Sequence, residues 1–101
     1  MTYSPDPFKV AAVDGFINVN FPAPEYEVTG TYDPEREACM FRIQCRGALA
    51  HQFGVSREFL DDHAVVEIES ILDSDRVLQS IKKQGPERIL ILTNNGVRDT
   101  Q

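Results

Sequence analysis

Residues 65–93 constrain the fold more than any other stretch, because they hold the densest apolar content in the chain. Their first part has the apolar periodicity of an amphipathic helix that runs to about Gln84. Gly85 and Pro86 then form a stop signal, since glycine caps a helix and proline cannot continue one. The apolar run at residues 89–92 predicts a strand that is covered on both faces or lies centrally in a sheet. We therefore expect one main helix packed on a sheet.

The helix in this stretch could be continuous or broken at residues 73–75. On a wheel of about 100° per residue, its polar side chains gather on one side, which favours a single helix. Asp75 falls instead in the apolar sector, near Ile68 and Ile71. A buried carboxylate needs a partner or a shifted pKa. Asp75 is therefore expected either to pair at the edge of the core or to contact a ligand or a second subunit, with Arg76 as its polar neighbour.

The N-terminal part predicts little regular structure before residue 17. Residues 1–9 carry two prolines and few apolar anchors, so an irregular arm is expected there. Residues 17–21 alternate between apolar and polar side chains, which is typical of a half-buried strand. Pro22 and Pro24 would end this strand, because proline cannot donate to a β-ladder.

Three antiparallel strands in a meander are expected in the middle of the chain. The clearest alternation lies at residues 39–45. A four-residue turn before this strand would place Val28 opposite Phe41, which keeps apolar with apolar. A three-residue turn around Gly47 pairs Phe41 with Phe53, whereas a two-residue turn would pair it with a glutamine, so the three-residue turn is favoured. The favoured registers also pair Tyr26 with Ile43, Cys45 with Leu49, Ile43 with His51, and Cys39 with Val55.

Charge limits the classes of partner. The chain has a formal net charge of −6 at pH 7, whereas a general nucleic-acid binder needs a basic footprint. Arg76, Lys82, Lys83 and Arg88 nevertheless gather around the end of the predicted helix. Such a run is usually a solvated face, and a local nucleic-acid patch is the alternative.

The cysteines and the N-terminus bear on location. Cys39 and Cys45 lie on one predicted strand, which separates them by roughly 20 Å at ~3.3 Å per residue. That distance is too long for a disulfide, so reduced thiols and a cytoplasmic location are expected. No apolar run approaches the ~20 residues of a membrane span, and the N-terminus lacks the pattern of a signal peptide. A membrane protein is therefore not expected.

Two clusters could carry chemistry, and both have ordinary structural explanations. Cys39, Cys45 and two histidines lack the short spacings of zinc ligands, so no metal site is expected. Asp61, Asp62 and His63 form an acid–histidine cluster that could serve acid–base catalysis. The cluster lies at a helix start, after a short helical turn that Ser56 is expected to cap, where carboxylates favour the helix end. Since phosphate-binding and nucleophile motifs are also absent from the sequence, no catalytic or cofactor-binding residue is expected.

Several short segments resemble a known group of bacterial proteins. These segments are Phe41-Arg42-Ile43 with Gly47, then residues 53–60, and later residues 71–76 with Ile81. Together they are similar to the domain-of-unknown-function family fourteen eighty-eight over about residues 17–93. The resemblance implies a bacterial origin and an α+β fold, and it brings no activity or catalytic residues. Asp75 stands where the family pattern would have Asn.

The sequence thus predicts an α+β domain at residues 10–93, between the irregular arm and a frayed tail at residues 94–101. An antiparallel meander of three to four strands and a C-terminal strand would pack against one main helix and a short helical turn. The expected function is a small non-enzymatic cytoplasmic module that binds a protein partner or itself. A nucleic-acid-associated regulator is the alternative. The candidate interaction residues are Asp75, Arg76, Lys82, Lys83 and Arg88.

Overall fold

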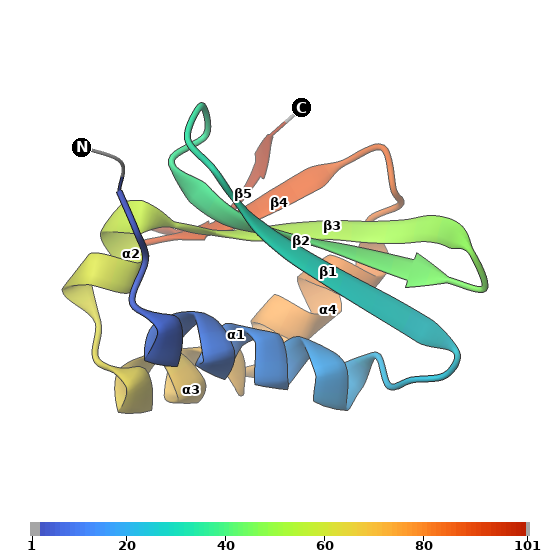
Figure 1. Ribbon diagram of the computed structural model, residues 1–101, viewed down its shortest axis with the longest axis horizontal. Helices are drawn as coiled ribbons and strands as arrows, with labels where there is room; N and C mark the ends of the chain where they lie inside the picture. The colour runs from blue at the N-terminus through green and yellow to red at the C-terminus, as the bar shows by residue number, and fades with distance from the viewer. Residues whose placement is uncertain (1–2, 101) are drawn as a thin grey trace.

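The computed structural model describes residues 3–100, except for the side chains of Asp75 and Thr100. Helices α1, α3 and α4 lie on one face of a five-stranded sheet, and α2 lies at the end of β3 (Figure 1). The fold is α+β, as predicted. In chain order the elements are α1 (Pro7–Asn20), β1 (Tyr26–Asp33), β2 (Ala38–Cys45), β3 (Ala48–Ser56), α2 (Arg57–Asp62), α3 (Val65–Leu72), α4 (Asp75–Lys83), β4 (Ile89–Thr93) and β5 (Gly96–Thr100).

The sheet has the order β1-β2-β3-β4-β5. Strands β1, β2 and β3 form the predicted antiparallel meander. The chain then crosses through the three later helices, so that β4 pairs parallel to β3. Strand β5 pairs antiparallel to β4 and forms the second edge of the sheet. The prediction of a frayed tail from residue 94 is therefore wrong, because a turn at Asn94 and Asn95 folds the tail back as β5.

The registers show how far an alternating pattern can define strand pairing. Phe41 pairs with Phe53 as predicted, but a register shift after Ile43 lets the hairpin close with a two-residue turn. Strand β1 is displaced by two residues from the prediction, because Val28 faces Ile43 and not Phe41. A two-residue slip keeps every side chain on its face, so the pattern alone cannot detect it. Of the remaining predicted pairs, Ile43–His51 and Cys39–Val55 are confirmed. The predicted partners of Tyr26 and Leu49 are wrong, because Tyr26 faces Cys45 and Leu49 faces Gln44.

Residues 7–20 form a helix where the sequence predicted an arm and a strand. Asp6 caps α1, since its carboxylate accepts a hydrogen bond of 2.9 Å from the backbone N–H of Phe8. Pro7 occupies the first turn, where its missing N–H has no cost. The predicted strand at residues 17–21 is wrong because its alternation reflects an apolar helix, of which Ile17 is fully buried.

The helical stretch after residue 64 is broken between α3 and α4, so the prediction of one continuous helix is wrong. Ile68 and Leu72 are buried in the first piece, and Val77 and Ile81 in the second. At about 100° per residue, the two pairs would point to opposite sides of a continuous helix. The break at residues 73–74 re-aims the chain so that both pairs reach the core.

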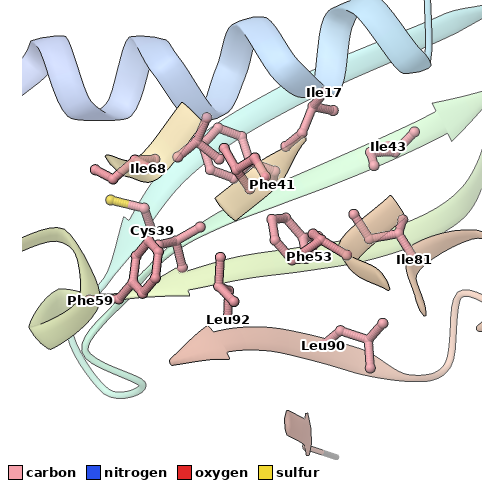
Figure 2. Close-up of a cluster of buried hydrophobic side chains, with 14 of the residues drawn as sticks. Ile17, Cys39, Phe41, Ile43, Phe53, Phe59, Ile68, Ile81, Leu90 and Leu92 are labelled. Carbon is pink, nitrogen blue, oxygen red and sulfur yellow. The ribbon is translucent and has the colours of Figure 1, made fainter. Parts of the chain in front are cut away.

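One main core lies between the sheet and the helices (Figure 2). Phe41 and Phe53 come from the sheet, and Ile17, Ile68 and Ile81 come from three different helices. Strand β4 lies between β3 and β5 and is buried along its three central residues, which confirms the central position that was one of the two alternatives predicted for residues 89–92. The core members are Val13, Ile17, Phe21, Cys39, Phe41, Ile43, Phe53, Val55, Phe59, Leu60, Ile68, Leu72, Val77, Ile81, Leu90 and Leu92.

The opposite face of the sheet has no helix over it within residues 3–100 (Figure 1). A small apolar cluster of Ala38, Met40 and Ile91 lies on this face. Met40 covers Gly54 on the neighbouring strand, where a larger residue would collide with its sulfur. No helix of the described chain is long and apolar enough to cross a membrane.

Candidate functional site

The predicted interaction residues separate into two places. Arg76, Lys82 and Lys83 line one shallow hollow on α4, together with Gln79 and Ser80. Arg88 does not line this hollow. Its guanidinium instead donates to the carboxylate of Asp99 on β5 at 2.8 Å. The prediction that Asp75 pairs or contacts a ligand concerns a side chain outside the described part of the structure.

The acid–histidine cluster is held by structural contacts. Asp61 accepts a hydrogen bond of 2.9 Å from the hydroxyl of Tyr3, and its second oxygen lies 3.7 Å from Nε of Arg57. Asp62 accepts a hydrogen bond of 2.7 Å from the amide of Asn94. His63 bonds the carbonyl of Phe59 through Nδ1 at 2.8 Å, and its ring stacks on the Phe59 ring. The contact of Asp61 joins α2 to the N-terminal arm, and that of Asp62 joins α2 to the turn before β5. The contact of His63 stays within the end of α2.

The cysteines and the second histidine are also parts of the framework. Both cysteines are free, and Cys39 is buried. Burial raises the pKa of the Cys39 thiol, which keeps it protonated. His51 donates from Nδ1 to the carbonyl of Gln84 at 2.9 Å and thereby ties β3 to the end of α4. Among the described residues, no three His, Cys, Asp or Glu side chains gather as metal ligands do.

Helix α1 presents an apolar stripe to solvent, which the sequence prediction missed. Phe8 is 75% exposed and Val19 is 79% exposed, and Ala11 and Gly15 between them are exposed too. Ala12 lies on the same side and is half-buried. At about 100° per residue these positions share one side of the helix. We call Phe8, Ala11, Ala12, Gly15 and Val19 the outer stripe of α1.

A second apolar feature lies beside the edge strand β1. A hollow of about 500 Å³ opens between β1, α1 and the N-terminal arm. Its lining includes Val10 of α1, Gly30 of β1 and Phe41 of β2. Asp14 is the only charged residue among the described residues that line it. We call this feature the β1–α1 hollow.

Tyr3 holds the arm against the rest of the fold. Its hydroxyl bonds Asp61, and the guanidinium carbon of Arg57 lies 4.0 Å from the centre of its ring. Its ring also packs against Tyr32 at a centroid distance of 5.1 Å. Burial, followed by the hydrogen bond and charge of Asp61, raises the pKa of Tyr3 to about 12. Ser4 and Pro5, which follow Tyr3 in the arm, line the β1–α1 hollow.

A signal for α1 was present in the sequence. Asp6 followed by Pro7 is the typical pair at a helix N-cap and first turn. The helix lacks a polar face, however, so apolar periodicity could not identify it. Both apolar features depend on α1, and both were missed for this reason.

No family model, curated protein or solved structure matches the chain. The resemblance to the domain-of-unknown-function family and the bacterial origin that it implies therefore stay predictions.

Proposed function

We propose that this chain is a small non-enzymatic interaction module of the cytoplasm that associates through the outer stripe of α1. The observation that carries the proposal is the exposure of Phe8 and Val19, at 75% and 79%, on a side of α1 that itself carries no charged residue. Glu69 of α3 and Asp73 at its C-cap flank this side, because they line the same hollow as Val19. Contiguous exposed apolar surface is typical of interfaces between proteins. The proposed occupant is a second copy of the chain, and a different protein partner is the alternative.

The order of residues in the outer stripe favours a second copy. When two α1 helices lie antiparallel about a twofold axis at the middle of the stripe, Phe8 of one copy meets Val19 of the other. The same arrangement places Ala12 against Gly15, so the smallest side chains lie where the helix axes cross. Small residues at a crossing allow helices to approach closely. The stripe is therefore complementary to itself, as a twofold interface requires.

The contacts of the acid–histidine cluster support a non-enzymatic function. Asp61, Asp62 and His63 each bond a structural partner, and these partners lie on different segments. A general acid or base must instead reach a reacting proton in a bound substrate.

Sedimentation equilibrium over a concentration series tests the proposal on the full chain. The stripe consists of five residues, whereas a standard interface involves roughly 20–30 residues on each side, so we expect weak, reversible dimerisation. Replacing Phe8 and Val19 together by serine should abolish it. The control is Leu49→Ser, because Leu49 on β3 is a half-buried apolar residue that belongs to neither the stripe nor the core clusters.

Two results would contradict self-association through this stripe. One is a wild-type chain that stays monomeric at the highest accessible concentration. The other is an equal loss of association in the Leu49→Ser control, because this would indicate general adhesion of apolar side chains.

A second candidate function is nucleic-acid association through α4. The observation that favours it is that Arg76, Lys82 and Lys83 line the same hollow. Fluorescence anisotropy with a labelled DNA or RNA at low salt tests this function. Contacts to about three phosphates predict a slope of log K against log salt of roughly −2 to −3. Absence of binding at low salt, or binding unchanged by replacing the three cations, would remove this candidate.

A further inference from the structure

We propose that the edge of β1 and the β1–α1 hollow together bind an extended segment of another protein, with an apolar side chain flanked by basic ones. The segment would add a strand to the sheet beside β1. This site shares Ala11 with the outer stripe of α1 but otherwise uses different residues, and it does not depend on self-association.

Strand β1 is an unprotected edge. It is eight residues long, its pairing with β2 is regular throughout, and it contains neither proline nor lysine. Short length, bulges, prolines and lysines are the usual means by which proteins protect such edges. Among the described residues, no backbone hydrogen bond joins the N-terminal arm to this strand. The outer backbone groups of Val28 and Gly30 are therefore available to a partner, whereas the Tyr3 ring packs beside Tyr32.

The backbone groups that face outward can be assigned. The N–H of Arg46 donates to the carbonyl of Glu25, which places residue 25 in a hydrogen-bonded position next to β2. Antiparallel ladders alternate between inward and outward groups along each strand. The N–H and C=O groups of Val28, Gly30 and Tyr32 consequently point away from β2. Gly30 and Tyr32 also line the β1–α1 hollow.

An added strand would direct alternate side chains into this hollow, because successive side chains of a strand point to opposite faces. The hollow is lined mainly by apolar residues, including Val10 of α1 and Phe41 of β2. An apolar side chain of the partner fits such a lining. Recognition by strand addition works in this way, since main-chain bonds supply affinity and a side-chain pocket supplies specificity.

Charge identifies the neighbours of that apolar side chain. Asp14 lines the hollow, and among the described residues it forms no ion pair. The chain as a whole carries a net charge of −6. Lysine or arginine two residues from the apolar side chain would lie on the same face of the added strand, within reach of Asp14. A second copy of acidic β1 fits less well, because it brings Glu27 and Asp33 in place of cations.

The test is a titration of the full ¹⁵N-labelled chain with the peptide acetyl-Thr-Lys-Thr-Leu-Thr-Lys-Thr-amide, followed by NMR. Its leucine and both lysines share one face when it is extended. We expect the largest amide shifts at Val28, Gly30 and Tyr32 of β1 and at Val10 and Asp14 of α1. Two control peptides have glutamate in place of lysine, or N-methyl groups on alternate residues that block strand pairing, and neither should bind.

The matched protein variants are Asp14→Asn and Glu87→Gln, each of which removes one negative charge. Asp14→Asn should weaken binding about two- to fivefold, as expected for an exposed ion pair. Glu87 does not line the hollow, so Glu87→Gln should leave binding of the lysine peptide unchanged.

Several outcomes would overturn the proposal. They are no binding of the lysine peptide, shifts confined to other elements, and equal binding of the acidic or N-methylated peptide. An unchanged affinity in Asp14→Asn would overturn the role of charge. Shifts of the β1 amides with protein concentration alone would assign the edge to a second copy of the chain.

Discussion

At the scale of single residues, we predict that replacing glycine by alanine has opposite effects on the free energy of unfolding at Gly30 and Gly15. A Cβ added at Gly30 would lie 2.9 Å from a ring atom of Phe41, which is buried and cannot easily move. We expect Gly30→Ala to lower the free energy of unfolding by about 1–3 kcal/mol. A Cβ at Gly15 would meet nothing within 4 Å, so Gly15→Ala should raise the free energy of unfolding by about 0.5–1 kcal/mol.

Urea denaturation at a protein concentration below that of association measures both free energies. A stabilising Gly30→Ala would contradict the packing of Phe41 against β1. A destabilising Gly15→Ala would contradict the open surface assigned to this side of α1.

Tyr3 provides a prediction that depends on pH. Its pKa is raised to about 12, so the neutral phenol is favoured in the folded chain. The stability that it contributes is therefore fully present below the ordinary tyrosine pKa of about 10 and is lost as the pH rises through about 12. In an alkaline titration followed by phenolate absorbance, the difference between wild type and Tyr3→Phe should titrate at about 12. A difference that titrates near 10 would show that the arm is not held against Asp61.

At the scale of elements, we expect the break between α3 and α4 to be set mainly by the core, although Ser74 at the N-cap of α4 is also a typical helix start. Ile68 and Leu72 require one helix direction, whereas Val77 and Ile81 require another. Replacing Asp73 and Ser74 together by alanine, a strong helix former, should therefore leave two separate helices. ¹³C chemical shifts at residues 73–74 measure this directly. Helical shifts across both positions would show that the local sequence sets the break.

A contrast between two faces identified the strands of the meander, whereas β4 was identified by a continuous apolar run after Gly85 and Pro86. The alternation at residues 39–45 defined β2 and its pairing of Phe41 with Phe53. Helix α1 has apolar residues on all sides, so its pattern carries no such contrast. The two apolar features of the candidate site were missed together with this helix, whereas the predicted cations Arg76, Lys82 and Lys83 do line one hollow. A wheel treats a helix as continuous, so it also could not detect a break that the tertiary core requires.

At the scale of the whole molecule, salt separates the two candidate functions. Two copies that each carry a net charge of −6 repel one another, and salt screens this repulsion. Self-association through an uncharged stripe should therefore become stronger as the salt concentration rises. Sedimentation equilibrium at low and high salt measures the change. Association that weakens with salt would contradict an apolar interface and point to contacts between opposite charges.

The central claim is that the outer stripe of α1 joins two copies in an antiparallel arrangement. The most direct measurement is an isotope-filtered NOE experiment on a mixture of labelled and unlabelled chains at high concentration. We predict intermolecular NOEs between the ring of Phe8 in one copy and the methyl groups of Val19 in the other. Intermolecular NOEs that join other surfaces and leave Phe8 and Val19 without any would contradict the claim.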